Sequence, residues 1–168
     1  MRWIVMIVAM MGLNTAYALQ PGDSVPDIRL PSTAGEDLSL HDLQGHWVVL
    51  YFYPRAFTPG CTAQSCSLRD EFGDIEARGA KIIGASLDSP ERQKAFKKEH
   101  ALPFELLSDI DKELARAFDS LMIGGLAAAR KTFIINPDGN VAHRFDRPRT
   151  ADHADEVIAK LDELMTID

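Results

Sequence analysis

Cys61 and Cys66 are the only cysteines of the chain, and both lie in one short stretch, YFYPRAFTPGCTAQSCSLRD, which runs from Tyr51 to Asp70. Two thiols this close together are typical of a structural disulfide, a redox couple or part of a metal site. A zinc site needs further ligands, and no histidine stands at ligand spacing near these thiols. A metal site is therefore the weakest of the three interpretations.

Cys61 is expected in the first turn of a helix. Thr58 is a good N-cap residue, and Pro59 is favoured at the first helical position, so Cys61 would be the third helical residue. There the Thr58 hydroxyl could accept a hydrogen bond from the backbone N–H of Cys61. The unpaired N–H groups and the positive end of the helix dipole favour a thiolate at this position. The pattern therefore predicts that Cys61 is a nucleophile.

Cys66 is expected on nearly the opposite side of the same helix, because each residue advances the helix by about 100°. It lies off the apolar stripe of Leu68, Phe72 and Ile75, which weakens its interpretation as an inert core thiol. On an intact helix the Cα atoms of the two cysteines would be roughly 8.6 Å apart, beyond the usual disulfide limit of about 7 Å. A disulfide would require the helix to unwind, which favours a redox couple over a permanent crosslink.

The elements that would hold this helix alternate between strands and helices. WVVLYFY, from Trp47 to Tyr53, is typical of a strand buried on both faces. This order predicts an α/β fold, a mixed central sheet covered on both faces by helices. Short strands are expected at 28–30 and 38–40, and longer strands at 47–53, 80–87, 104–107, 131–136 and 141–145. Helices are expected at 58–78, 89–100, 111–118 and from about Thr150. The last helix carries an inward apolar stripe of Val157, Ile158, Leu161 and Leu164.

The first eighteen residues are predicted to be a secretory signal peptide. They combine Arg2, an apolar run from Trp3 to Leu13, and a small-x-small cleavage pattern at Ala16–Ala18. The run is shorter than the roughly 20 residues needed to span a bilayer. We therefore expect cleavage after Ala18, a periplasmic or secreted protein, one domain over residues 19–168 and no membrane attachment after cleavage.

The chain is acidic, with 25 Asp and Glu against 18 Lys and Arg. Because Arg2 is the only charged residue of the first eighteen, its removal changes the formal net charge from −7 to −8. Such a surface repels nucleic acids and anionic membranes, so neither is expected as a partner.

Pro54-x-x-x-Thr58-x-x-Cys61 resembles the active-site signature of the peroxiredoxins. The longer stretch around it, together with SLDSPERQKAFKKEHALPFELLSD and RKTFIINPDGNV, is similar to the bacterioferritin comigratory protein, or peroxiredoxin Q, branch. The resemblance implies a thioredoxin-like fold with an N-terminal extension and a thiol peroxidase activity without metal, haem or flavin. Cys61 then matches the peroxidatic cysteine, Cys66 the resolving cysteine of some members, and Arg130 the arginine ahead of the TFII strand.

The expected chemistry gives each of these residues a task. Thr58 can hydrogen-bond a peroxide oxygen, Arg130 offers a permanent cation and several N–H donors, and Pro54 would shield the pocket from water. Attack by Cys61 on a peroxide yields a sulfenic acid, which Cys66 can convert to a disulfide. A thioredoxin-like protein is expected to reduce that disulfide. The five histidines are scattered and are interpreted as structural.

Two other functions stay open at this point. An exported thiol-disulfide oxidoreductase usually carries Cys-x-x-Cys, whereas four residues separate Cys61 from Cys66 here. A noncatalytic thioredoxin-fold binding module would not need both cysteines. The segment Leu121–Ala129, LMIGGLAAA, is more apolar and richer in glycine than the family pattern, so the shape of the pocket beside Arg130 is not fixed by the resemblance. The oligomeric state is expected to be a monomer.

Overall fold

The structure is a computed structural model and describes residues 18–166. The predicted signal peptide falls almost entirely on residues 1–17, which lie outside the described residues. Within residues 18–166, no helix has the length and apolar character required to cross a membrane.

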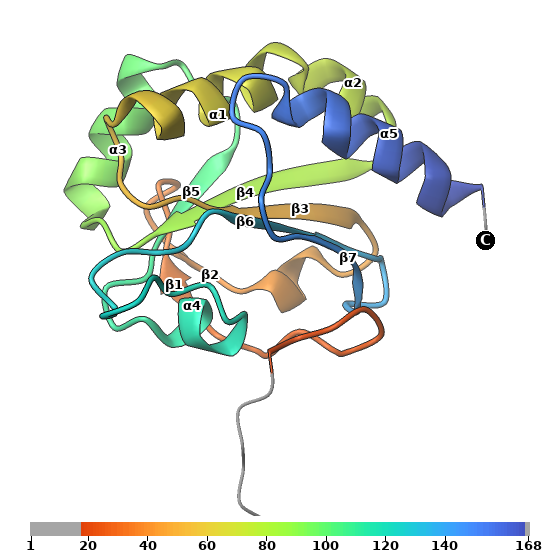
Figure 1. Cartoon of the computed structure of the whole chain (residues 1–168), viewed down its shortest axis with the longest axis horizontal. Helices are drawn as coiled ribbons and strands as arrows, with labels where there is room; N and C mark the ends of the chain where they lie inside the picture. The colour runs from red at the N-terminus through yellow and green to blue at the C-terminus, as the bar shows by residue number, and fades with distance from the viewer. Residues whose placement is uncertain (1–17, 167–168) are drawn as a thin grey trace, which may run out of the picture.

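A five-stranded mixed sheet forms the centre of the molecule (Figure 1). Its strands are β3 (Trp47–Phe52), β4 (Ala80–Ser86), β5 (Glu105–Ser108), β6 (Lys131–Ile135) and β7 (Val141–Phe145). They lie in the order β5-β4-β3-β6-β7, where β3, β4 and β5 are parallel and β6 runs antiparallel to both β3 and β7. The prediction of a mixed α/β sheet is therefore confirmed.

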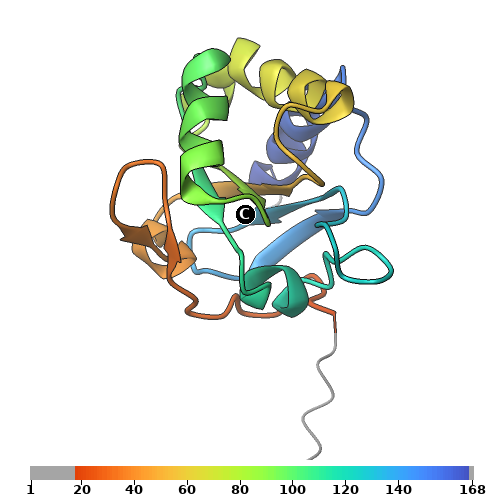
Figure 2. The same ribbon diagram turned by 90° about the vertical axis from the view of Figure 1, so that its left-hand side faces the viewer.

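Helices cover both faces of this sheet, as Figures 1 and 2 show. One face carries α1 (Pro59–Asp70), α2 (Phe72–Ala77), α3 (Pro90–Glu99) and α5 (His153–Met165). The other face is covered by α4 (Glu113–Ala117) and by the N-terminal extension, which contains β1 (Leu30–Pro31), β2 (Asp37–Leu38) and the 3-10 helix η1 (Leu40–Leu43).

The central strand β3 contributes side chains to two hydrophobic cores, one on each face of the sheet. Val49 and Tyr51 face α1, α3 and α5, whereas Val48, Leu50 and Phe52 face α4 and the extension. All five are buried, which confirms the prediction from WVVLYFY. Because side chains alternate along a strand, a strand in the middle of a covered sheet must be apolar on both faces.

The predicted helix 58–78 is wrong in one respect, because it is divided at Glu71 into α1 and α2. Glu71 leaves helical geometry, with φ −102° and ψ 16°, and its N–H points to the carbonyls of Ser67 and Arg69. Gly73, a poor helix former, lies two residues later. The break allows Leu68 of α1 and Ile75 of α2 to enter the same core, where both are buried.

Other boundaries moved for local reasons. The second N-terminal strand ends at Leu38, because Ser39 caps η1 by accepting the N–H of His41. Helix α4 begins at Glu113 rather than Asp111, because Lys112 adopts a left-handed φ of 63°. The last helix, α5, begins at His153 rather than near Thr150.

Candidate active site

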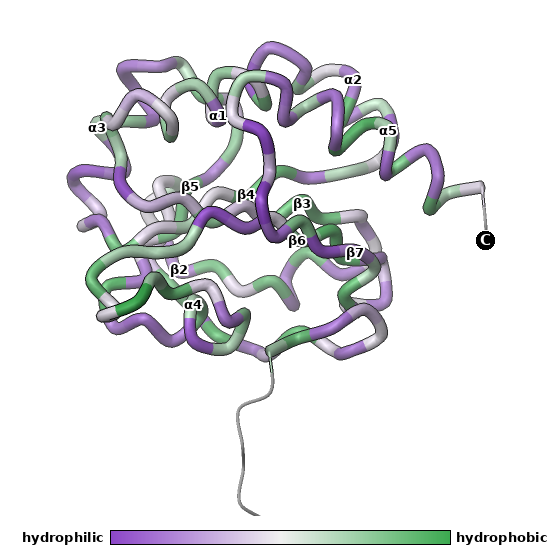
Figure 3. The backbone as a smooth tube through the Cα atoms, viewed as in Figure 1, coloured by the Kyte–Doolittle hydropathy of each residue, from purple (hydrophilic) through white to green (hydrophobic). Residues whose placement is uncertain are grey.

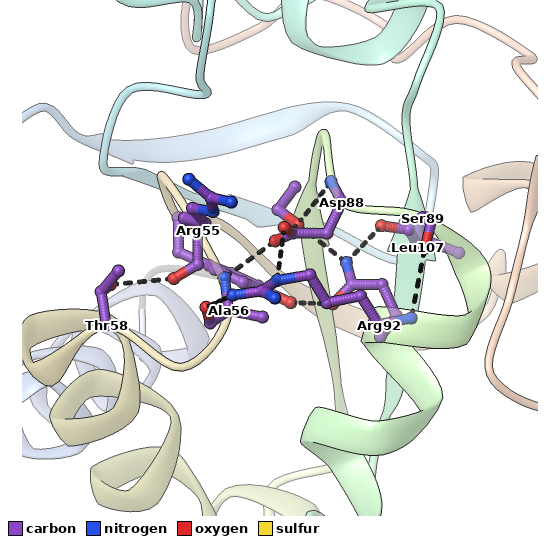
Figure 4. Close-up of polar contacts among 10 residues, drawn as sticks. Arg55, Ala56, Thr58, Asp88, Ser89, Arg92 and Leu107 are labelled. Carbon is purple, nitrogen blue, oxygen red and sulfur yellow. Dashed lines mark hydrogen bonds and ion pairs between the residues drawn. The ribbon is translucent and has the colours of Figure 1, made fainter.

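The loop between β3 and α1 is held in place from the side by α3. Asp88, which follows β4, accepts the N–H of Ala56 at 2.8 Å, and Arg92 of α3 donates to the carbonyl of Ala56 at 2.8 Å. Asp88 and Arg92 form an ion pair at 3.1 Å (Figure 4). Both backbone groups of Ala56 are therefore fixed, which positions Pro54 on one side and Thr58 on the other.

Phe57 occupies the one strained position in this loop, with φ 67°. A non-glycine residue with left-handed φ costs free energy, and such residues persist where the surroundings hold them. Here the Arg92 guanidinium lies 5.1 Å from the centre of the Phe57 ring, and Phe96 packs edge-on against it at 5.2 Å. This strained residue turns the chain into α1 immediately before Thr58.

A buried network of hydrogen bonds holds the carboxylate of Asp88 in place. Ser86 donates to Asp88 at 2.7 Å, and Gln93 of α3 donates to Ser86 at 3.0 Å and to the carbonyl of Leu107 at 2.8 Å. The Tyr53 hydroxyl donates to the side-chain carbonyl of Gln93. Sequence reasoning did not identify these residues, although Ser86, Asp88 and Gln93 all lie in or next to the SLDSPERQ segment that carries the family resemblance.

Thr58 is the N-cap of α1, but the predicted side-chain cap is wrong. Its hydroxyl donates to the carbonyl of Arg55 at 2.8 Å instead of accepting the N–H of Cys61. Among the residues that the structure describes, no side chain caps the first turn of α1. The hydroxyl oxygen keeps lone pairs, and the first-turn N–H groups remain available to a ligand oxygen.

Cys61 lies in that first turn, as predicted, and its side chain is fully buried. Arg130 Nη2 is 3.4 Å from Cys61 Sγ, and Arg130 Nη1 is 2.7 Å from Gln64 Oε1. The guanidinium and the N-terminus of α1 therefore both direct positive charge toward the sulfur.

Two neighbours of Arg130 were missed from the sequence. Gln64, one helical turn after Cys61, is fully buried and orients the guanidinium through its side-chain carbonyl. Gly60 leaves the space that Arg130 fills, because a Cβ at Gly60 would lie 3.2 Å from Arg130 Nη2. The signal for Gln64 was its i, i+3 spacing from Cys61, which places both side chains on the same helix face.

Cys66 lies away from this cluster and is half-buried, and both cysteines are free thiols. The inward face of α1 carries Cys61, Gln64, Ser65 and Leu68, all buried. Cys66 is outside that stripe, as its position in the helix predicts. The intact helix therefore separates the two cysteines.

Next to the loop lies an open groove of about 440 Å³. Half of its lining is apolar and half is charged or polar: Pro54, Leu87, Leu126 and Ala127 against Arg55, Asp88, Ser89 and Arg92. Leu126 belongs to a hairpin that joins α4 to β6, in which Leu121 pairs with Ala128. Figure 3 shows that this hairpin is largely hydrophobic. The glycine-rich segment 121–129 therefore contributes Leu126 and Ala127 to the wall of this groove.

His153 is structural in its setting, as expected for the histidines. Its ring joins Thr132 of β6, with Nε2 2.8 Å from Oγ1, to Glu156, with Nδ1 3.1 Å from Oε2. Burial lowers the pKa of His153 below its ordinary value, against the opposing effect of Glu156. A hydroxyl, an imidazole and a carboxylate in a row resemble a hydrolase triad, but Thr132 and His153 are fully buried and out of reach of a substrate. The row fastens α5 to β6.

Within residues 18–166, no group of three or more His, Cys, Asp or Glu side chains is arranged to hold a metal ion.

Fold and site together define a thiol peroxidase of the thioredoxin-like class. A model of the AhpC/TSA family matches residues 21–144, and the chain belongs to this family. Its relatives include Peroxiredoxin Bcp of Escherichia coli (strain K12), 38% identical over 151 residues that cover 86% of this chain and 97% of the relative. Peroxiredoxin Bcp of Bacillus subtilis (strain 168) is 36% identical over 152 residues, 87% of this chain and 97% of the relative.

Solved structures agree with this assignment. The bacterioferritin comigratory protein of Xanthomonas campestris, described for its alkyl peroxide reduction activity, superposes with a TM-score of 0.78 at 34% identity over 84% of this chain and 98% of its own. The peroxidoxin BcpB of Mycobacterium tuberculosis superposes with a TM-score of 0.79 at 32% identity over 86% and 97%. The thioredoxin-like fold and the peroxiredoxin resemblance are thus confirmed, and the peroxidase is favoured over the oxidoreductase and the binding module.

Proposed function

We propose that Cys61 is the residue that reduces hydrogen peroxide and organic hydroperoxides. The observation that carries this proposal is the 3.4 Å contact between Arg130 Nη2 and Cys61 Sγ in the first turn of α1. The Cys61 thiolate attacks the terminal peroxide oxygen, the O–O bond breaks, and the remaining oxygen leaves as water or an alcohol after protonation. Cys61 becomes a sulfenic acid.

Arg130, Thr58 and Pro54 serve this step. Negative charge grows on the departing oxygen as the O–O bond breaks, and donors placed in advance stabilise it. Arg130 supplies a cation with several N–H groups at the sulfur, and the Thr58 hydroxyl can bond a peroxide oxygen and keep the reacting atoms in line. Pro54 lines the groove beside the loop and shields the reacting atoms from water.

Organic hydroperoxides are proposed as substrates for two reasons. The Xanthomonas campestris relative is described for alkyl peroxide reduction. In this chain the groove beside Pro54 contains the apolar side chains of Leu87, Leu126 and Ala127 among charged and polar ones, and an alkyl group can lie on these three.

Cys66 is proposed as the resolving cysteine. Its thiol attacks the sulfenic sulfur of Cys61, an S–S bond forms, and water leaves. A thioredoxin-like dithiol protein then reduces the disulfide by thiol exchange, and the enzyme acts as a monomer. A long Cα separation on the intact helix means that α1 must unwind between the two cysteines before they bond.

Replacing Cys66 by serine tests this assignment. Cys66→Ser is expected to keep the first oxidation of Cys61 but to form no intramolecular disulfide. The sulfenic acid should persist, react with a sulfenic-acid reagent and advance to sulfinic acid at higher peroxide. Mass spectrometry of peroxide-treated wild type and variant distinguishes these products. Turnover with a dithiol protein equal to that of the wild type would refute the role of Cys66.

We also propose that the protein is exported and cleaved after Ala18. The pattern of Arg2, an apolar run and Ala16–Ala18 supports this. Leu19, the first residue after the proposed cleavage, packs partly buried against the core on the α4 side of the sheet. The first residue of the proposed mature chain therefore contacts the core.

N-terminal sequencing of protein recovered outside the cytoplasm is the test of export. The mature chain is expected to begin at Leu19, and a variant with Ala16 and Ala18 both replaced by bulky residues is expected to remain uncleaved. Exported material that still begins at Met1 would rule the proposal out.

A further inference from the structure

We propose that the hydrogen bond between Tyr51 and Ser65 is a latch that slows formation of the Cys61–Cys66 disulfide and leaves the first oxidation unchanged. Tyr51 Oη lies 2.9 Å from Ser65 Oγ, and both side chains are fully buried. Tyr51 belongs to the central strand β3, and Ser65 lies in α1 between the two cysteines. The proposal rests on the disulfide step proposed above.

The latch acts on the segment that has to unwind. Between the cysteines, two side chains fasten α1 to the sheet: Gln64 through Arg130, and Ser65 through Tyr51. Beyond Cys66, Ser67 accepts the N–H of Ala154 in α5 at 3.1 Å, and Arg69 donates to the carbonyl of His100, the C-cap of α3, at 2.9 Å. Unwinding between residues 61 and 66 breaks the first pair of contacts and can leave the second pair intact. The C-terminal half of α1 is then the fixed end.

The place of the phenol is built into the neighbouring strands. A Cβ at Gly84 of β4 would lie 2.9 Å from both Cζ and Oη of Tyr51 and 2.6 Å from Cδ2 of Leu106. Glycine in the middle of a strand weakens it and often marks a close approach. Here the close approach is that of the phenol tip, which can reach α1 only because Gly84 has no side chain.

The Tyr51 ring is also held independently of α1. It stacks on Tyr53 with centroids 5.5 Å apart and meets Phe104 edge-on at 6.0 Å. Burial raises the pKa of Tyr51 far above its ordinary value, so the hydroxyl stays neutral and can bond Ser65 as donor or acceptor. The latch therefore has one fixed partner, Tyr51, and one that moves with the helix, Ser65.

Breaking the latch should change only the second step. In that step the Cys66 thiol displaces the hydroxyl of the Cys61 sulfenic acid as water, so no further oxidant is involved. In Tyr51→Phe the ring remains, and the Ser65 hydroxyl can turn to a carbonyl one turn earlier in its own helix. The unwound state is then favoured by about fivefold, the size of shift that one net hydrogen bond produces. A longer-lived folded helix in the wild type leaves more time for oxidation to sulfinic acid.

The experiment compares Tyr51→Phe, Ser65→Ala and the double variant with wild type by rapid quenching, after one equivalent of hydrogen peroxide for the disulfide step and after an excess for sulfinic acid, which consumes a second peroxide. Trapping with a sulfenic-acid reagent measures the first step, and mass spectrometry measures disulfide and sulfinic acid. Each single variant is expected to form the disulfide about fivefold faster, with unchanged sulfenic-acid formation and less sulfinic acid. The double variant should be no faster than the faster single variant, because both remove one bond.

Ser67→Ala is the matched control, since it removes an anchor of the same helix that lies outside the unwinding segment. It leaves the Ala154 N–H without its acceptor and should lower stability, yet disulfide formation should keep the wild-type rate. Equal acceleration in Ser67→Ala, or a wild-type disulfide rate in Tyr51→Phe, overturns the latch. A wild type that oxidises Cys61 but forms no disulfide overturns the proposed resolving step instead, so the two failures are distinguishable.

Discussion

Cys61→Ser is expected to abolish peroxide reduction. A serine hydroxyl stays protonated at neutral pH, and even beside Arg130 it cannot attack the O–O bond as a thiolate does. Peroxide consumption by the variant, followed with a dithiol reductant present, should equal that of buffer with reductant alone. Thiol counting after peroxide treatment should show that Cys66 remains reduced.

The control for this variant is a test that Cys61→Ser still folds. Serine is close in size to cysteine, but the hydroxyl enters a fully buried position, so circular dichroism and thermal unfolding must accompany the kinetics. Cys66→Ser serves as the matched variant, because it also removes one thiol from α1 but should keep the first oxidation. Peroxide consumption by a folded Cys61→Ser protein would move the nucleophile to another residue.

The location of Cys61 could be predicted because its cause is local. Proline at the first helical position and a capping threonine fix the start of α1 within a few residues, and the structure keeps that start. The detail of the cap could not be predicted. The hydroxyl of Thr58 could either accept the N–H of Cys61 or donate to the carbonyl of Arg55. The strained turn at Phe57 brings that carbonyl within 2.8 Å, and the hydroxyl bonds to it.

The contact between Arg130 and Cys61 has a nonlocal cause. The two residues are 69 positions apart, and they meet because β6 pairs antiparallel with β3, with Lys131 opposite Phe52. Alternation of strands and helices indicates a sheet but not the order of its strands, so only the family resemblance pointed to Arg130. The Asp88–Arg92 pair was missed for a different reason, since a charged pair at i, i+4 at the start of a helix is usually solvent-exposed.

Arg130→Ala is expected to slow the reaction of Cys61 with peroxide by about 100-fold or more, the usual cost of removing a donor that stabilises transition-state charge. The guanidinium holds Cys61 Sγ at 3.4 Å with one nitrogen and Gln64 with the other, so its loss affects both sulfur and the departing oxygen. Single-turnover kinetics with excess hydrogen peroxide measure this step without the reductant. A folded variant with the wild-type rate would remove Arg130 from the mechanism.

Arg130→Lys separates charge from geometry. Lysine keeps the cation but lacks the planar fork that reaches Cys61 and Gln64 together, so most of the loss should remain. The pH profile then decides which stage Arg130 serves. If it only kept the sulfur ionised, Arg130→Ala would regain the wild-type rate at a pH high enough to ionise the thiol. Because the charge on the departing oxygen also needs a donor, we expect the variant to stay slower at every pH. Full recovery at high pH would confine Arg130 to the ground-state thiolate.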